Sequence, residues 1–127
     1  MAEAAVTMPV VLLVLMFGIN ISAASYTAVA AANAANYGAR IGAVSRVDPQ
    51  FWAQAGAMAS LSSSHAGGTF TVPFPQVDTK PGGVVVVTVS WTYPMVFKGL
   101  CLTFGGNKDI CKDFSGTVMS AWKKEGW

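Results

Sequence analysis

No charged side chain occurs between Glu3 and Arg40, and this long neutral stretch limits the folds that are open to the chain. Pro9 is its only strong helix breaker, so we predict a single helix over residues 3–46, kinked at most at the proline. At about 1.5 Å per residue such a helix is about 60 Å long, whereas about 20 apolar residues suffice to cross a bilayer. The N-terminal part of the chain is therefore predicted to enter a membrane or the interior of an assembly.

The two halves of this predicted helix differ in side-chain size. The first half, VVLLVLMFGINI, is bulky and aliphatic on all sides, which suits lipid or a hydrophobic bundle. The second half, SAASYTAVAAANAANYGA, consists mostly of small residues, and small residues let helix backbones approach each other closely. We therefore expect the second half to pack against parallel copies of itself, with its Asn and Ser side chains forming hydrogen bonds across the contact.

Two simpler interpretations of this helix compete with an assembly role. A cleavable signal peptide would begin with basic residues, whereas this chain carries Glu3 and no Lys or Arg there, so we expect the helix to be retained. A plain membrane anchor fits the apolar length equally well. The positive-inside rule would place Arg40 and Arg46, the first basic residues, on the cytoplasmic side, but processing and extraction from the membrane would remove that constraint.

Composition separates the chain into two parts. It has 127 residues, of which 53% are hydrophobic and 11% charged, against about a quarter charged in ordinary soluble domains. All charges but one lie at or after Arg40, so we divide the chain into a hydrophobic N-terminal helix, residues 1–46, and an extracytoplasmic domain, residues 47–127. A net charge of +2 and scattered lysines are not typical of nucleic-acid binding, and the adjacent Lys123 and Lys124 are expected at a solvated end.

The second part is predicted to form one short helix and a small antiparallel sheet, which makes the fold class α+β. Asp48 and Pro49 are typical of the cap and first turn of a helix, and apolar residues follow at helical spacing, so we predict a helix over residues 49–61. We expect this helix to pack on one side of the sheet. Strands are predicted within residues 68–75 and 82–95, and as two or three short pieces of residues 100–124.

The longest predicted strand, GGVVVVTVSWTYPM, has one continuously apolar face. The opposite face becomes polar towards the end of the strand, as in a strand that is half-buried. We expect the apolar face to line the core; it carries Val85, Val87, Val89, Trp91 and Tyr93.

The two cysteines, Cys101 and Cys111, flank the segment LTFGGNKDI, whose Gly-Gly-Asn turn signal favours a hairpin that brings its ends together. An even cysteine count after a membrane-type segment favours a disulfide over two buried thiols. Without a C-x-x-C motif or a companion histidine, the pair is not typical of a zinc site.

The sequence contains no recognisable catalytic or cofactor-binding arrangement. His65 lies in a Ser/Gly loop without a nearby acidic or cysteine partner and is expected to be an exposed polar residue. Asp109 and Asp113 flank Cys111 as turn charges, and neither an acid pair nor a nucleophile with its base nor a phosphate loop is evident. We expect no enzyme activity, no cofactor and no metal.

Three segments of the chain, taken in order, carry a family resemblance. EAAVTMPVVLLVLMFGI has a Glu six residues before a Pro, followed by an aliphatic run, and NAANYGAR is close to a signature of Asn-Ala-Ala, two variable residues and Gly-Ala-Arg. VVVVTVSWTYPMVF is a Val-rich strand that ends in an aromatic-Pro step. In this order and spacing the chain resembles the TadE-like family, the pilin-like proteins of tight-adherence (Tad) pilus and related secretion systems.

The resemblance implies a precursor that is cut by a prepilin-type peptidase and held in the inner membrane before pilus assembly machinery extracts it. The product would be a pilin-like subunit of a helical, type IV-like filament of identical copies, exposed at the cell surface and used for adhesion. It further implies that Glu3 pairs with the terminal amine of a neighbouring subunit. The alternative is a membrane-anchored minor pilin or accessory component that forms no fibre. Residues expected at contacts between subunits are Glu3, Pro9, Gly18, Asn20, Ala31, Asn33, Ala35, Gly38, Arg40 and Gly42.

Overall fold

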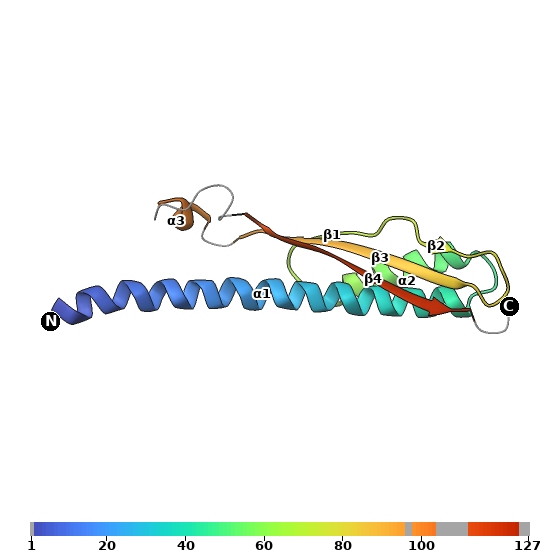
Figure 1. Cartoon of the computed structure of the whole chain (residues 1–127), viewed down its shortest axis with the longest axis horizontal. Helices are drawn as coiled ribbons and strands as arrows, with labels where there is room; N and C mark the ends of the chain where they lie inside the picture. The colour runs from blue at the N-terminus through green and yellow to red at the C-terminus, as the bar shows by residue number, and fades with distance from the viewer. Residues whose placement is uncertain (1, 96–97, 104–111, 125–127) are drawn as a thin grey trace.

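A single long helix forms the axis of the molecule, in a computed structural model that describes residues 2–95, 98–103 and 112–124. Helix α1, Ala2–Val44, has 43 residues and continues through Pro9. The sheet and the second helix cover only its C-terminal half, and its N-terminal half projects from them (Figure 1). The predicted helix is confirmed, with its end at Val44 instead of residue 46.

Helix α2, Pro49–Ser63, follows after a tight connection and runs back along α1. Asp48 occupies the N-cap position with a φ of 47°, and its side chain forms no capping hydrogen bond. Pro49 stands in the first turn, where a missing N–H costs nothing. The start of the helix is thus as predicted, and the helix is two residues longer than predicted.

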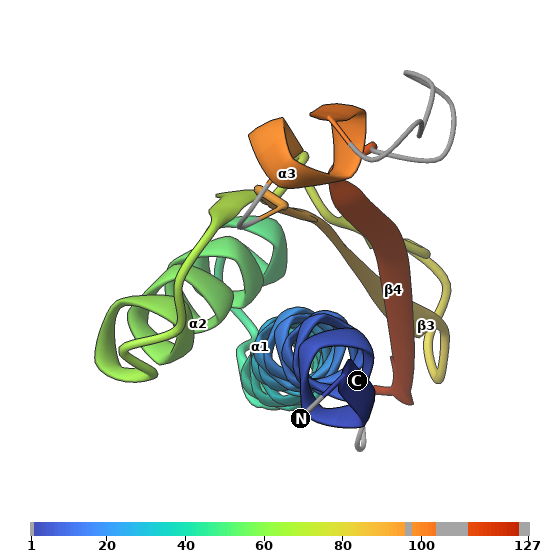
Figure 2. The same ribbon diagram turned by 90° about the vertical axis from the view of Figure 1, so that its left-hand side faces the viewer.

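The sheet is antiparallel and is organised around β3, Val84–Tyr93, with which all the other described strands pair. Along one edge β3 pairs with two short strands, β1, Thr69–Thr71, and β2, Gln76–Val77. Along its other edge it pairs with β4, Phe114–Lys123, in an unbroken register from Val84 opposite Lys123 to Tyr93 opposite Phe114. Figure 2 shows the sheet and α2 on different sides of α1. The α+β fold class is confirmed.

One predicted strand piece is wrong. Residues 98–103 form a short helix, α3, Lys98–Thr103, instead of a strand. A piece of four to six residues is too short for periodicity to distinguish a strand from a helical turn. The hairpin was predicted between Cys101 and Cys111; its first residues fall in α3, and residues 104–111 lie outside the described residues.

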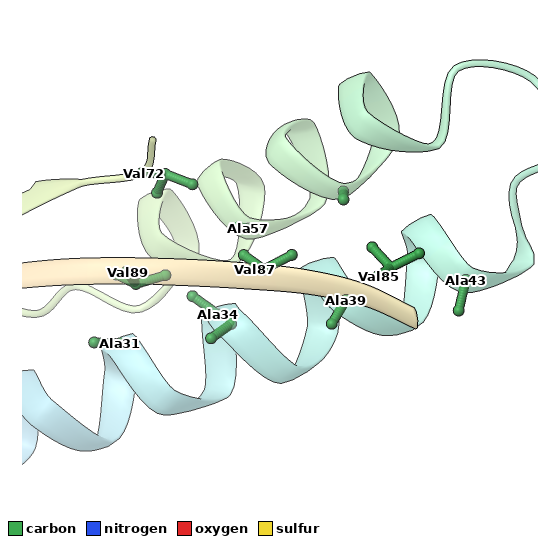
Figure 3. Packing of buried hydrophobic residues seen from close by; sticks show 11 residues of the cluster. Ala31, Ala34, Ala39, Ala43, Ala57, Val72, Val85, Val87 and Val89 are labelled. Atoms are coloured by element: carbon green, nitrogen blue, oxygen red, sulfur yellow. The ribbon is translucent and has the colours of Figure 1, made fainter. Parts of the chain in front are cut away.

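The core lies where α1, α2 and β3 meet (Figure 3). The helices contribute mostly alanine, and β3 contributes the branched side chains of Val85, Val87 and Val89, none of which is exposed. The apolar face predicted for this strand is therefore the core face, although Trp91 and Tyr93 are only half-buried. From the helices the core includes Ala31, Ala34, Ala35, Ala39 and Ala43 of α1 and Ala53 and Ala57 of α2.

Side-chain hydrogen bonds attach the loop after α2 to α1. The Tyr26 hydroxyl donates to the carbonyl of Ser64 at 2.9 Å. The buried hydroxyl of Thr27 lies 3.0 Å from the carbonyl oxygen of Gly67 and 3.1 Å from that of Ala23, one turn earlier in its own helix. The core and these bonds together make the C-terminal half of α1 part of the folded domain.

Candidate functional site: the exposed arm of helix α1

The first 18 residues of α1, residues 2–19, form an arm that the rest of the chain leaves exposed. Every residue of the arm is exposed except Met16, which is half-buried. Burial begins at Asn20, whose side chain is 3% exposed, and continues along one helix face to Ala43. The large apolar side chains exposed on the arm are Val6, Met8, Val10, Val11, Leu12, Leu13, Val14, Leu15, Phe17 and Ile19.

The arm is suited to an apolar environment. Exposed aliphatic side chains on all sides of a helix are unfavourable in water and favourable in lipid or against other apolar helices. Within the described part of the chain, α1 is the helix long and apolar enough to cross a membrane. At about 1.5 Å per residue the arm itself is about 27 Å long, close to the thickness of a bilayer core.

The C-terminal half of α1 instead packs closely on α2. A Cβ added to Gly38 would lie 2.6 Å from the carbonyl oxygen of Ala53 and 2.9 Å from the Cβ of Ala57. A Cβ added to Gly42 would lie 2.7 Å from the Cβ of Ala53. All three distances are shorter than real Cβ contacts, so glycine at these two positions lets the two helix backbones come together.

Three hollows border α1 within the described residues, and two of them lie between α1 and α2. One of about 250 Å³ lies at Tyr26 and Asn33, where Ser60 and Ser63 of α2 form the other wall. A second hollow, of about 340 Å³, is lined by Tyr37 of α1 and by the same two serines of α2. A third of about 300 Å³ continues to the end of the helix and is lined by Tyr37, Arg40, Ile41, Val44 and Ser45.

The structure places the ten predicted contact residues in two groups. Half are exposed on the arm or on the outer face of α1, namely Glu3, Pro9, Gly18, Asn33 and Arg40. The other half are buried, namely Asn20, Ala31, Ala35, Gly38 and Gly42. Contacts inside one chain account for the small size of most residues in the buried group. They do not account for Gly18 in the exposed group, because a Cβ added there would meet nothing within 4 Å. A role of any of the ten in contacts between subunits stays a prediction.

The predicted disulfide is not tested by the described residues. Cys101 lies in α3, where its side chain is not described, and Cys111 lies outside the described range. His65 is exposed, as predicted. Within the described residues no three His, Cys, Asp or Glu side chains are grouped so that they could hold a metal ion.

Sequence reasoning missed two features of this region. Lys124, predicted at a solvated end, is 5% exposed, and its backbone N–H donates to the carbonyl of Gly83 at 2.8 Å. Its neighbour Lys123 is exposed, as predicted. The hollows beside Tyr37 were also not predicted, because they depend on how α2 crosses α1.

Comparison with known proteins identifies one family. The family model described as TadE-like protein matches residues 1–40, a range that contains two of the three segments on which the resemblance was based. The third segment, residues 84–97, lies outside the match. No curated protein and no solved structure matched the chain. The match confirms the predicted resemblance: residues 1–40, which hold both the exposed arm and most of the helix face that lines the core, are a TadE-like segment.

Proposed function

We propose that this protein is a pilin-like subunit of a Tad-type filament and that it polymerises through the exposed arm of α1. The TadE-like match indicates a protein associated with a Tad pilus system, and such proteins are in general structural. The observation that carries the proposal is the division of α1: residues 2–19 are exposed and mostly apolar, whereas one face of residues 20–43 is buried against the rest of the domain.

This division supports assembly because the arm lacks any partner within the described chain that would cover its apolar surface. In the membrane, lipid would cover it before assembly. In a filament, the arms of neighbouring subunits would take the place of lipid and would be buried at the centre, with the domains outside. The lone Glu3 carboxylate would need a partner in either setting, because an unpaired charge in an apolar environment is costly.

The proposal includes the partners and the location expected from the resemblance. A prepilin-type peptidase would process the chain in the inner membrane, pilus assembly machinery would extract it, and the filament would stand on the cell surface and serve adhesion. The disulfide between Cys101 and Cys111 would form in the oxidising space outside the cytoplasm.

The proposal is tested on material sheared from the surface of cells that express the full chain. Electron microscopy with labelling of this chain, paired with intact-mass analysis of the recovered protein, is expected to reveal filaments that contain a processed form. A chain that stays in the membrane fraction while cells still carry filaments without it would favour the anchored accessory component instead.

A matched pair of variants separates the arm from the domain. Val10→Asp places a charge on the arm, at a side chain that is 55% exposed, and is expected to abolish filament incorporation. Val84→Asp places the same charge at the start of β3, where the Val84 side chain is 41% exposed. This variant is expected to leave incorporation intact. Equal incorporation of both variants would contradict the proposal.

A further inference from the structure

A further hollow lies at the end of the domain that is furthest from the arm. It has a volume of about 380 Å³ and is bordered by the start of α2, by β2 and by the residue that follows β4. Because α2 starts just beyond the end of α1, the hollow is about 60 Å along the helix axis from the first turn of the arm (Figure 1). The side chains that determine its chemistry are Asp48, Gln50, Phe51, Phe74, Thr79 and Lys124. None of them belongs to the hydrophobic core.

Two phenyl rings at this hollow are open to solvent. The Phe51 side chain is 58% exposed and that of Phe74 is 62% exposed. Phe74 lies between Pro73 and Pro75, and Pro75 is buried, so the backbone that carries this ring is stiff and anchored. A ligand that covers the ring therefore loses little free energy to ordering of the protein. The two rings form an apolar surface that is already in place before anything binds.

The Asp48 carboxylate is not used by the helix that it precedes. Asp48 occupies the N-cap of α2, where an aspartate ordinarily accepts a hydrogen bond from the first turn, but its side chain forms no such bond. Its φ of 47° lies in the left-handed region, which a non-glycine residue rarely adopts. The residue is exposed, and within the described chain its carboxylate forms no ion pair. Both carboxylate oxygens can therefore accept hydrogen bonds from a ligand.

The other polar residues narrow the class of ligand. Lys124 lines the hollow from a nearly buried position, and its charge balances that of Asp48, so the described lining has no net charge. Gln50 adds an amide donor and acceptor, and Thr79 adds a hydroxyl. A highly charged ligand gains no net attraction from this lining, and a purely apolar ligand would leave its polar groups without hydrogen bonds. A neutral sugar has both an apolar C–H face for the rings and hydroxyl groups for the polar residues.

We infer that this hollow binds one neutral hexose unit of a polysaccharide. The C–H face of the sugar ring packs on Phe51 and Phe74, and two adjacent hydroxyl groups donate to the Asp48 carboxylate. The volume of about 380 Å³ is in the range of small-molecule sites. The inference rests on the adhesion role in the proposed function and names its ligand class, whereas sugar binding itself requires no filament.

The site is tested on the full chain in a detergent without a sugar headgroup. Neutral tetrasaccharides of glucose, galactose and mannose are titrated separately by calorimetry, with polyglutamate and an uncharged apolar peptide as the competing ligand classes. At least one tetrasaccharide is expected to bind saturably, and neither polyglutamate nor the peptide is expected to bind.

Two variants in the hollow and one control locate the binding. Phe74→Leu keeps an apolar side chain but removes the flat ring, and Asp48→Asn removes the charge with a residue that suits the same left-handed backbone. Each is expected to raise the Kd about tenfold. Tyr37→Leu removes a comparably exposed ring at a different hollow and is expected to leave the Kd unchanged.

The outcomes separate this site from the assembly proposal. If no tetrasaccharide binds, the site is wrong, and filaments that contain the chain would still support assembly. Sugar binding that neither Phe74→Leu nor Asp48→Asn weakens would also overturn the site, because the sugar would then lie elsewhere. Binding of polyglutamate or of the apolar peptide that these variants weaken would contradict a sugar site. Sugar binding at the hollow by a chain that forms no filament would support the site and count against assembly alone.

Discussion

Gly38 lies so close to the carbonyl of Ala53 that a single methyl group at Gly38 would come within 2.6 Å of that oxygen. The relationship identifies what the small residues of α1 do within one chain. They allow α2 to lie directly on α1, and Gly56 of α2 completes the contact, since a Cβ there would be 3.5 Å from the Cα of Gly38.

Gly38→Ala is therefore expected to lower the free energy of unfolding of the domain by about 1–3 kcal/mol, because the added Cβ forces the two helices apart. Thermal unfolding of the full chain in mild detergent, followed by near-ultraviolet circular dichroism, measures the change. Gly18→Ala is the control, since its Cβ would meet nothing within 4 Å and the transition should not move. Equal transitions for the two variants would argue against the close contact.

A second prediction concerns the hydrogen bond between helix α1 and the loop after α2. Thr27→Val keeps the shape of a fully buried side chain and removes the hydroxyl that lies 3.0 Å from the carbonyl of Gly67. The expected loss is about 1 kcal/mol of unfolding free energy, with faster amide exchange in residues 64–68. Thr7→Val removes a comparable hydroxyl on the exposed arm, bonded 2.6 Å from the carbonyl of Glu3, and should leave domain stability unchanged.

The sheet offers a third test at the pair of Trp91 and Gly116, which are opposite each other in β3 and β4. A Cβ at Gly116 would lie 2.8 Å from the indole ring, so Gly116→Val is expected to displace the ring and destabilise the domain by about 1–3 kcal/mol. Thr117→Val, at the next position and exposed, keeps the ring in place and serves as the control. A stable Gly116→Val variant with unchanged aromatic circular dichroism would contradict the packing.

The fourth prediction is the disulfide between Cys101 and Cys111. Intact-mass analysis after alkylation is expected to find both thiols blocked without reductant and both alkylated after reduction. Because the bond would close a short loop, its removal by Cys101→Ser with Cys111→Ser is expected to cost about 2–4 kcal/mol. Two free thiols in the protein recovered from the cell envelope would rule the bond out.

The sequence predicted which segments form the helices and the main strands better than it predicted what those elements pack against. Alternation along Val85, Val87 and Val89 identified the core face of β3, because a half-buried strand needs that period. The alanine and glycine pattern of α1 predicted close packing against parallel copies, whereas the structure shows close packing against α2 of the same chain. The same small residues suit either partner, so packing between copies stays a prediction.

Two other features depend on tertiary contacts that local patterns do not contain. The terminal position of Lys124 predicted exposure, yet the residue is buried where its backbone bonds to the turn at Gly83. The arm was predicted as apolar, but the point at which it leaves the domain, near Asn20, follows from the reach of the sheet along α1. The sequence alone placed the division at residues 46 and 47, which separates α1 from the α2 and β3 residues that share its core.

The division of α1 into an exposed arm and a core half is the central claim, and thermal unfolding of a chain that begins at Asn20 tests it most directly. Without the arm, this chain is expected to stay soluble and monomeric without detergent and to unfold in one cooperative transition by circular dichroism, because the core residues from Ala24 onwards are retained. A chain that begins at Val47 lacks five of the core alanines and is expected to have no such transition. A chain from Asn20 that aggregates or melts without cooperativity, or a chain from Val47 that unfolds cooperatively, would contradict the account.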